Sequence, residues 1–171
     1  MSTASARGTG PAPPHRDLVL RHATAEDVPD IVAMLADDAL GAQRETPGEL
    51  APYEHAFARI DGDPNQHLMI AEHAADTPGG PPRPVGTLHL TIIPGLSRRG
   101  ATRSLIEAVR VHTDARGTGL GTQLIEWAIA ESRRQGCALV QLTSDATRVD
   151  AHRFYERLGF EASHLGFKMT L

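Results

Sequence analysis

The chain contains one cysteine, no long apolar run and no excess of positive charge over its 171 residues. Because a disulfide needs two cysteines, none can form within the chain. Cys137 follows Gly136 at the start of an apolar run, which favours burial as a small hydrophobic side chain over catalysis as a thiol. No apolar segment is long enough to span a membrane, and the net charge of −4 gives no reason to expect nucleic-acid binding.

The segment from Met1 to Arg16 consists mainly of Ser, Thr, Ala, Gly and Pro. It lacks the apolar core of a secretory signal, and we expect residues 1–16 to form a disordered leader. Residues 17–171 are long enough for one domain, and a hydrophobic content of 40% supplies a core without disulfides or metals. The sequence therefore predicts a cytoplasmic protein with a single folded domain.

The periodicity of apolar residues changes repeatedly between strand and helix along the chain. Thr24 caps the first helix, with the acidic Asp27 three residues later. The expected strands are 18–22, 67–73, 85–93, 103–112 and 138–143, followed by two short closing strands at 160–162 and 166–171. The other expected helices cover 52–60, 119–135 and 150–158, with Gly159 as the C-terminal cap of the last. This order predicts a mixed α/β (α+β) fold whose first half is antiparallel and whose second half alternates strands with helices.

The strand that ends near Val111 runs into a loop with glycines at positions 117, 119 and 121, and this loop opens a long amphipathic helix. Glycines let the backbone approach an anion closely, and the unpaired N–H groups at a helix start attract negative charge. Arg116 can add a charge-assisted contact. The loop lacks the Lys-Ser/Thr pair of a P-loop and the glycine spacing of a dinucleotide site. From the residues alone, a pyrophosphate site and a glycine-rich turn without a ligand are about equally supported.

Arg116, Gly119 and Gly121 form an Arg-x-x-Gly-x-Gly motif, and residues 154–160 read FYERLGF. These two motifs, in this order, and the opening LRHATAEDVPDIVAML resemble the GNAT family of N-acetyltransferases over residues 18–171. The resemblance implies a mixed central sheet, splayed between the parallel strands 103–112 and 138–143 and flanked by helices. It also implies that acetyl-CoA, the acetyl donor, lies in the V between those strands. The stretch RVDAHRFYERLGF is similar to small-amine acetyltransferases, among them enzymes that act on aminoalkylphosphonates.

The resemblance also assigns cofactor-binding positions. The strand segment Val109, Arg110 and Val111 would pair through its main chain with the pantetheine arm. The amides of seven consecutive residues would hold the pyrophosphate: Arg116, Gly117, Thr118, Gly119, Leu120, Gly121 and Thr122. Arg148 stands where many relatives carry an asparagine bonded to pantetheine, so it either reaches the CoA phosphates or leaves that contact absent. His152 is a further candidate for a phosphate contact.

Tyr155 is the candidate general acid, because an ordinary phenol pKa of about 10 is well matched to a departing thiolate. The alternative role for Tyr155 is packing of its helix onto the sheet. Glu107 is the candidate base, since relatives carry a glutamate on this strand that acts through a water on the incoming ammonium. A charge between Ile106 and Ala108 is unusual in mid-strand, which favours a role as base. An exposed charge where the two parallel strands separate accounts for Glu107 equally well.

The resemblance therefore implies an acetyl-CoA-dependent N-acyltransferase that acetylates a primary amine of a small molecule, by direct attack through a tetrahedral intermediate. Two alternatives stay open: a protein or peptide N-acetyltransferase, and a non-catalytic acetyl-CoA-binding module. Tyr155, Glu107 and the glycine loop favour catalysis over the binding module. No pair among the nine histidines has metal-ligand spacing with a carboxylate partner, so no metal is expected. The expected partner is an amine substrate, with no nucleic acid or membrane, and a homodimer is compatible with the fold.

Overall fold

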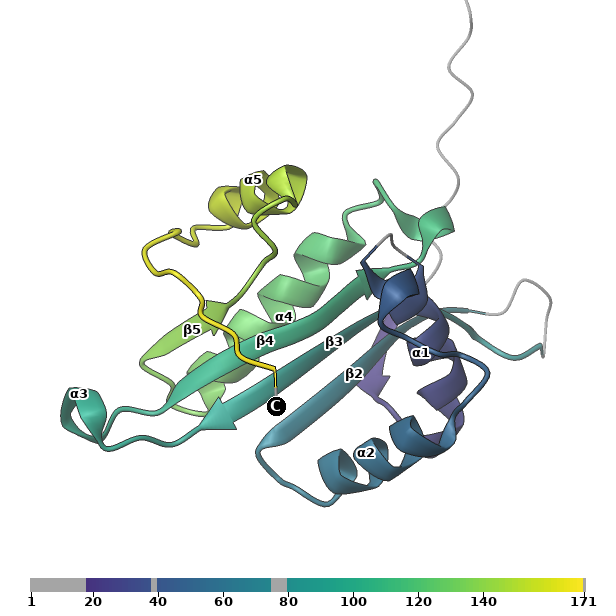
Figure 1. The fold of residues 1–171 in the computed structure, drawn as a ribbon, viewed down its shortest axis with the longest axis horizontal. Coiled ribbons are helices and arrows are strands. Elements are labelled where there is room, and N and C mark those ends of the chain that lie inside the picture. Colours follow the sequence, from purple (N-terminus) through teal and green to yellow (C-terminus); the bar gives the residue numbers. More distant parts are fainter. Residues whose placement is uncertain (1–17, 38–39, 75–79, 171) are drawn as a thin grey trace, which may run out of the picture.

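The computed structural model describes residues 18–170 apart from 38–39 and 75–79, so the expected leader at 1–16 lies outside the described part. A five-stranded sheet in the order β1-β2-β3-β4-β5 forms the centre (Figure 1). The strands are β1 (Leu18–His22), β2 (Gln66–His73), β3 (Arg83–Ile93), β4 (Arg103–Val111) and β5 (Leu139–Leu142). The helices are α1 (Val28–Ala36), α2 (Ala51–Asp61), α3 (Ser97–Gly100), α4 (Leu120–Arg134) and α5 (Val149–Arg157), with 3₁₀ turns η1 (Ala25–Asp27), η2 (Gly41–Gln43) and η3 (Thr113–Ala115). Every strand and helix expected between residues 18 and 158 is present, and the loop expected at 94–100 contains the short α3.

The sheet divides at its fourth strand. β1 to β4 pair antiparallel in sequence order, whereas β5 lies parallel to β4. β5 pairs only with the start of β4, from Arg103 to Ile106. The remaining residues of β4, 107–111, have β3 on one side and no strand of the described chain on the other. The splayed mixed sheet predicted from the sequence is therefore confirmed, and its opening runs along the second half of β4.

Each face of the sheet is covered by its own helices, with α4 behind and α1 and α2 in front in Figure 1. The larger buried cluster includes Leu120, Leu124 and Ile125 of α4, which pack with residues of β3 and β4. A Cβ atom at Gly86 of β3 would lie 3.2 Å from Leu120 Cδ2, so the missing side chain lets the start of α4 lie close to the sheet. No helix in the described ranges combines the length and the apolar character needed to cross a membrane.

Over the described residues 160–170 neither of the closing strands expected at 160–162 and 166–171 is formed, and this segment is irregular. Leu165, Phe167 and Met169 are 85%, 92% and 83% exposed. An alternating sequence forms a strand only where a neighbour satisfies its backbone hydrogen bonds. Within the described chain β5 pairs only with β4, so this segment has no strand beside it. The prediction of closing strands is wrong for the single chain. Alternation of apolar residues indicates that a segment can form a strand, but it does not say which neighbouring strand would pair with it.

The start of α1 is fixed to the sheet by a charged cluster. The Asp27 carboxylate accepts hydrogen bonds from the Thr24 amide at 2.7 Å and from the two Nη atoms of Arg21 at 2.7 and 2.9 Å. Arg21 also donates to Glu72 of β2 at 2.8 Å. Burial alone would raise the pKa of Asp27, but the hydrogen bonds from Arg21 and Thr24 outweigh it and hold the pKa below its ordinary value. Thr24 is the N-cap of the 3₁₀ turn η1, and Asp27 is the N-cap of α1 that follows directly. The predicted pairing of Thr24 with Asp27 is therefore present at the start of the helical segment, and Arg21 ties it to β1 and β2.

Replacement of Asp27 by asparagine is expected to lower the free energy of unfolding by about 1–3 kcal/mol at neutral pH, because a charged acceptor of several donors is lost. The pKa of Asp27 in the folded state is below the unfolded value of 3.8, so its carboxylate stabilises the fold fully above that pH and no longer stabilises it once the pH falls through the folded pKa. In urea titrations the difference in free energy of unfolding between wild type and variant should therefore narrow below about pH 4. A difference that stays constant into acid would contradict this account, and the exposed Asp30→Asn is the control.

Candidate functional site

A hollow of about 350 Å³ lies where the end of β4, the start of α4 and α5 meet. Its wall comes from η3 and the loop after it, from the first turn of α4 and from α5. The lining residues are Val111, Ala115, Arg116, Gly117, Gly119, Leu120, Gly121, Thr122, Phe154 and Arg157. The glycine loop singled out in the sequence therefore forms one wall of a cavity.

Two glycines give this loop its shape. Gly117 has a φ of 78° and Gly119 a φ of 88°, in the left-handed region that favours glycine. Thr118, between them, donates its hydroxyl to the Ala115 carbonyl at 2.8 Å. Gly119 is the N-cap of α4, so the amides of the next three residues have no acceptor within the helix. Together with the positive end of the helix dipole, these amides suit an anion such as a pyrophosphate.

The side chain of Arg116 fastens the loop to the rest of the fold. It donates through Nη2 to Asp37 Oδ2 at 2.9 Å and through Nε to the Val111 carbonyl at 3.2 Å. Asp37, which directly follows α1, also accepts a hydrogen bond from the Thr113 hydroxyl. The guanidinium of Arg116 therefore links the loop to the end of α1. Arg157 of α5 places a second basic side chain on the wall of the hollow.

The second half of β4 leads from the paired sheet to this hollow with one side open. The carbonyls of Val109 and Val111 accept hydrogen bonds from side chains, Arg110 Nη1 at 2.9 Å and Arg116 Nε at 3.2 Å. A bulge interrupts this stretch, since the register with β3 shifts and Ala108 has a φ of 52°. Such strain in a non-glycine residue is typical of functional backbone. The sequence did not predict the bulge, because alanine has no preference for positive φ.

Tyr155 is half-buried on α5 between two aromatic rings. Its ring centroid lies 5.1 Å from that of Phe154 and 5.9 Å from that of Phe160. Burial raises the pKa of the Tyr155 phenol above its ordinary value, and the charges of Arg148 and Arg110 offset part of the rise. The phenol is therefore protonated at neutral pH, as a proton donor must be.

Glu107 is exposed on β4, opposite His89 of β3. His89 Nε2 lies 2.8 Å from Gln66 Oε1, which also accepts a hydrogen bond from the Thr91 hydroxyl at 2.9 Å. Because an amide oxygen only accepts, Nε2 carries the proton and Nδ1 keeps its lone pair. Burial lowers the pKa of His89, and Glu107 offsets part of this effect. A neutral imidazole therefore lies beside Glu107, a pairing that depends on the register of β3 and β4 and that no local sequence pattern indicates.

Five of the candidate cofactor residues do not line the hollow: Val109, Arg110, Thr118, Arg148 and His152. Arg148 directly precedes α5, and its charge acts on the phenol described above. His152 Nε2 lies 2.8 Å from the Asp145 carbonyl oxygen, so its ring holds the turn between β5 and α5. The α5 residues that line the hollow are Phe154 and Arg157. They stand three residues apart on one helix face, and that spacing is the signal that could have identified them.

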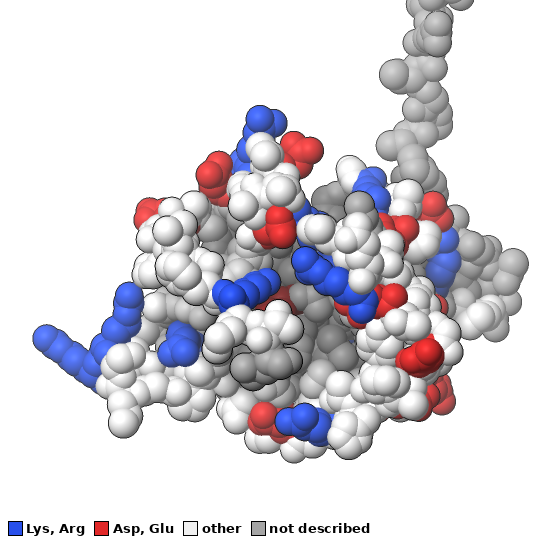
Figure 2. All heavy atoms as spheres, in the orientation of Figure 1, with Lys and Arg blue, Asp and Glu red and all other residues white. Residues whose placement is uncertain are grey.

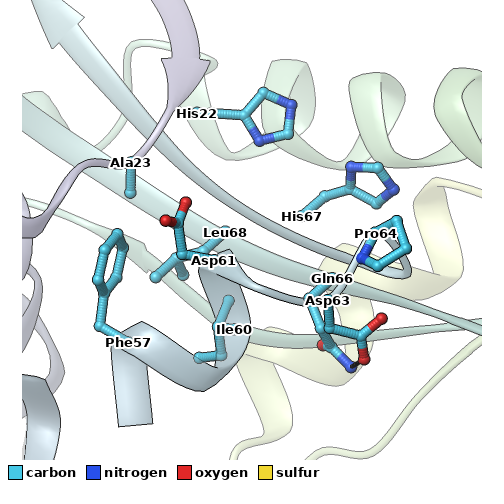
Figure 3. A pocket seen from close by; sticks show the side chains of 10 residues that line it. All are labelled: His22, Ala23, Phe57, Ile60, Asp61, Asp63, Pro64, Gln66, His67 and Leu68. Carbon is cyan, nitrogen blue, oxygen red and sulfur yellow. Dashed lines mark hydrogen bonds between the residues drawn. The ribbon is translucent and has the colours of Figure 1, made fainter. Parts of the chain in front are cut away.

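A second hollow, of about 220 Å³, lies between the end of α2 and the start of β2 (Figure 3). The rings of His22 and His67 stand next to each other there, with centroids 5.6 Å apart. His67 Nε2 is buried without a hydrogen bond, 4.0 Å from Glu131 Oε1 of α4. Burial lowers the pKa of His67, and Glu131 offsets part of this effect. No group of three or more His, Cys, Asp or Glu side chains in the described ranges could hold a metal ion.

Residues 30–160 match the sequence profile described as "Acetyltransferase (GNAT) family". An aminoalkylphosphonate N-acetyltransferase of Salmonella typhimurium is 31% identical over 152 residues, which cover 89% of this chain and 90% of the relative. A glucosamine 6-phosphate N-acetyltransferase of Trypanosoma brucei brucei is 38% identical over 89 residues, 52% of this chain and 58% of the relative. A crystal structure described as a transcriptional regulator from Bacillus halodurans C-125 has a TM-score of 0.82 at 43% identity and covers 91% of this chain and 100% of its own. The chain belongs to the acetyltransferase (GNAT) family and is an acetyl-CoA-dependent N-acyltransferase.

Proposed function

We propose that the chain transfers the acetyl group of acetyl-CoA to the primary amine of a small molecule. One observation carries this proposal: Val111 belongs both to the open edge of β4 and to the wall of the anion hollow. The pyrophosphate of acetyl-CoA would bind the amides at a helix start, and its amide-containing arm would lie along a strand edge. A site for the whole molecule therefore needs these two features next to each other. Cβ atoms at Gly117 and Gly119 would meet no atom within 4 Å, so open space lies over the loop where phosphates would bind.

When bound, acetyl-CoA supplies a thioester-activated acetyl group for direct attack by the amine through a tetrahedral intermediate. The attack needs a neutral amine and a proton for the departing thiolate. Glu107, with the neutral His89 beside it, accepts the proton of the incoming ammonium through a water. Tyr155, whose phenol is protonated because burial raises its pKa, donates the proton to the thiolate.

Basic side chains support an amine substrate that also carries an anionic group. Figure 2 shows Lys or Arg side chains on both sides of the recess in the middle of this face. The pKa of Asp145 is lowered by hydrogen bonds from Thr147 and further by the charges of Arg44 and Lys168. Basic side chains from two segments that are distant in the sequence therefore both act on Asp145. The names of two relatives refer to a phosphonate and to a sugar phosphate. We therefore infer a small amine with a phosphonyl or phosphoryl group as the acceptor.

A panel of amines tests this assignment through the release of free thiol from acetyl-CoA. The panel contains aminoalkylphosphonates, an amino sugar phosphate, the same amines without the anionic group, and a peptide with a free N-terminus. We expect kcat/KM to be about 100-fold higher for the anionic amines than for their neutral counterparts, since only the anionic group can form charge-assisted hydrogen bonds with basic side chains. The highest activity on the peptide would instead support protein or peptide acetylation.

Glu107→Gln is expected to lower kcat/KM for the amine by about 10–100-fold at neutral pH, because an amide cannot accept the proton. The pKa of His89 is lowered from 6.5, and the Glu107 charge offsets part of the lowering, so a base role for His89 would place the acidic limb of the pH–rate profile below pH 6.5 and move it further down in the variant. With Glu107 as the base, we expect the variant to lose the acidic limb. A variant that keeps an acidic limb and the activity of wild type on its plateau would exclude Glu107 and leave His89 as the base; the exposed Glu126→Gln on α4 is the control.

A further inference from the structure

Three polar side chains, one each from β2, β3 and β4, form a row on the face of the sheet that points away from α4. Leu90 of β3 and Ile106 of β4 are buried in the cluster with α4. Since side chains alternate along a strand, the neighbouring His89 and Glu107 point to the opposite face. The register makes His89 and Glu107 direct partners across the two strands, so their side chains lie beside each other. Gln66 of β2 completes the row through its contact with His89.

The orientation of the Gln66 amide follows from its neighbours. Its Nε2 donates to Asp63 Oδ2 at 3.4 Å, and its Oε1 accepts from the Thr91 hydroxyl at 2.9 Å and lies 2.8 Å from His89 Nε2. Figure 3 shows Gln66 and Asp63 together at the second hollow. Hydrogen bonds, chiefly from the Asn65 amide, lower the pKa of Asp63, so its carboxylate is ionised and only accepts. The reverse orientation would turn the amide oxygen toward that carboxylate, so the oxygen faces His89.

The Gln66 oxygen in turn determines which nitrogen of His89 can accept a hydrogen bond. Nε2 must carry the proton to donate to an amide oxygen, so Nδ1 of the neutral ring keeps its lone pair. The ring makes no other hydrogen bond within the described ranges. Burial lowers the pKa of His89, while Glu107 raises it and His67 of β2 lowers it, both by less than burial does. An acceptor nitrogen is therefore held beside the Glu107 carboxylate at neutral pH.

A water that carries a proton from the incoming ammonium to Glu107 needs a defined orientation. Its oxygen must offer a lone pair to the ammonium, and one of its hydrogens must point to the carboxylate. Its second hydrogen also needs an acceptor, and Nδ1 of His89 can supply one beside Glu107. The other tautomer of His89 would donate from Nδ1 and occupy a lone pair of the water instead.

We propose that His89 accepts the second hydrogen of this water, and that Gln66 is the residue that positions His89 for it. An N–H bond of the ammonium breaks as an O–H bond forms on the water, and the water passes one of its own protons to the Glu107 carboxylate. The amine is left neutral, Glu107 becomes a carboxylic acid, and the imidazole is unchanged. This inference rests on the proposed function and adds two positioning residues to it.

The protonation of His89 can be measured without any acetyl transfer. Long-range ¹H–¹⁵N spectra of protein labelled with ¹⁵N-histidine show which ring nitrogen carries the proton, and His89→Phe identifies the signals among the nine histidines. We expect the proton on Nε2 in wild type at neutral pH, and a larger share on Nδ1 in Gln66→Leu. Gln66→Glu should keep the proton on Nε2 and raise the pKa of His89, because a carboxylate there favours the imidazolium. A wild-type ring with its proton on Nδ1 would overturn the proposal.

Thiol release measured across pH tests whether this arrangement serves the reaction. Gln66→Leu is expected to lower kcat/KM for the amine by about 10-fold, since the water loses its fixed orientation. Gln66→Glu keeps an acceptor opposite Nε2, so we expect it to retain at least about half of the wild-type kcat/KM, but only above the raised pKa of His89. Gln135→Leu is the matched control, because it removes an amide hydrogen bond of 2.8 Å to Glu131 on α4 and should keep the wild-type profile.

Two kinetic outcomes would overturn the proposal: a Gln66→Leu variant with the kcat/KM and pH profile of wild type, or a Gln66→Glu variant as impaired as Gln66→Leu at every pH. Circular dichroism checks that each variant is folded. A wild type that releases no thiol with any amine would refute the proposed function and this inference with it. Failure of this inference alone is seen in the Gln66 variants of an active enzyme, so the two failures are distinguishable.

Discussion

Tyr155→Phe is expected to lower kcat by about 10²–10³-fold while changing the Kd of CoA by less than about threefold. Phenylalanine keeps the ring between Phe154 and Phe160 but removes the only proton that the ring can donate. Because the pKa of Tyr155 is raised from its ordinary value of 10, activity that needs the protonated phenol is expected to decline only above pH 10. Steady-state thiol release measures kcat, and calorimetric titration with CoA measures binding.

The second tyrosine of the chain supplies the control for this prediction. The Tyr53 hydroxyl accepts a hydrogen bond from the Thr46 amide at 2.8 Å and donates to Glu45 at 2.9 Å, and Tyr53 does not line the hollow. Tyr53→Phe should therefore keep kcat within about twofold. A Tyr155→Phe enzyme with the turnover of wild type would remove Tyr155 from the chemistry and leave it a packing role on α5.

Gly119→Val is expected to raise the Kd of CoA by at least about 100-fold. The φ of 88° at Gly119 is strained for any side chain, and most strongly for a β-branched one, so the loop must move to relieve it. Movement misaligns the amides that follow, and each hydrogen bond to a charged group is worth about 1.5–3 kcal/mol. The loss of two such bonds is sufficient for the expected change. Calorimetry with CoA is the measurement.

Gly121→Ala is the matched control within the same loop and helix. A Cβ atom there would lie 3.5 Å from Phe154 Cζ, an ordinary contact, and alanine favours the helix. We expect this variant to bind CoA within about threefold of wild type and to be at least as stable to heat. If Gly119→Val bound CoA as tightly as wild type, the hollow would not be the pyrophosphate site.

Features set by local sequence could be predicted from the chain alone. The alternation of apolar residues identified β2, β3 and β4, and the glycines at 117 and 119 identified a loop that the structure gives a positive φ. The pairing of Thr24 with Asp27 at η1, the 3₁₀ turn that leads into α1, followed from residue type and spacing, because both partners lie within one turn.

Features that depend on distant contacts could not be predicted in this way. Arg116 lines the hollow, as expected of an anion contact, but its hydrogen bond to Asp37, 79 residues away, could not be predicted. His89 reaches Glu107 only through the register of β3 and β4, which a bulge at Ala108 modifies. Residues 163–170 carry the alternation of a strand, yet the fold does not place them beside the free edge of β5 as a paired strand. Local patterns specify elements, whereas partners at long range depend on packing of the whole fold.

The unequal lengths of the two parallel strands also set a distance. β4 has nine residues and β5 pairs with the first four, which leaves five residues of open edge between Glu107 and Val111. At about 3.3 Å per residue this edge is roughly 16 Å long. With the pyrophosphate in the hollow and Glu107 as the base, as proposed, the arm of the donor must extend along this edge to bring its thioester to Glu107. We therefore expect thioesters on shorter arms to be poor acyl donors, because the length of the open edge sets the reach that the arm needs.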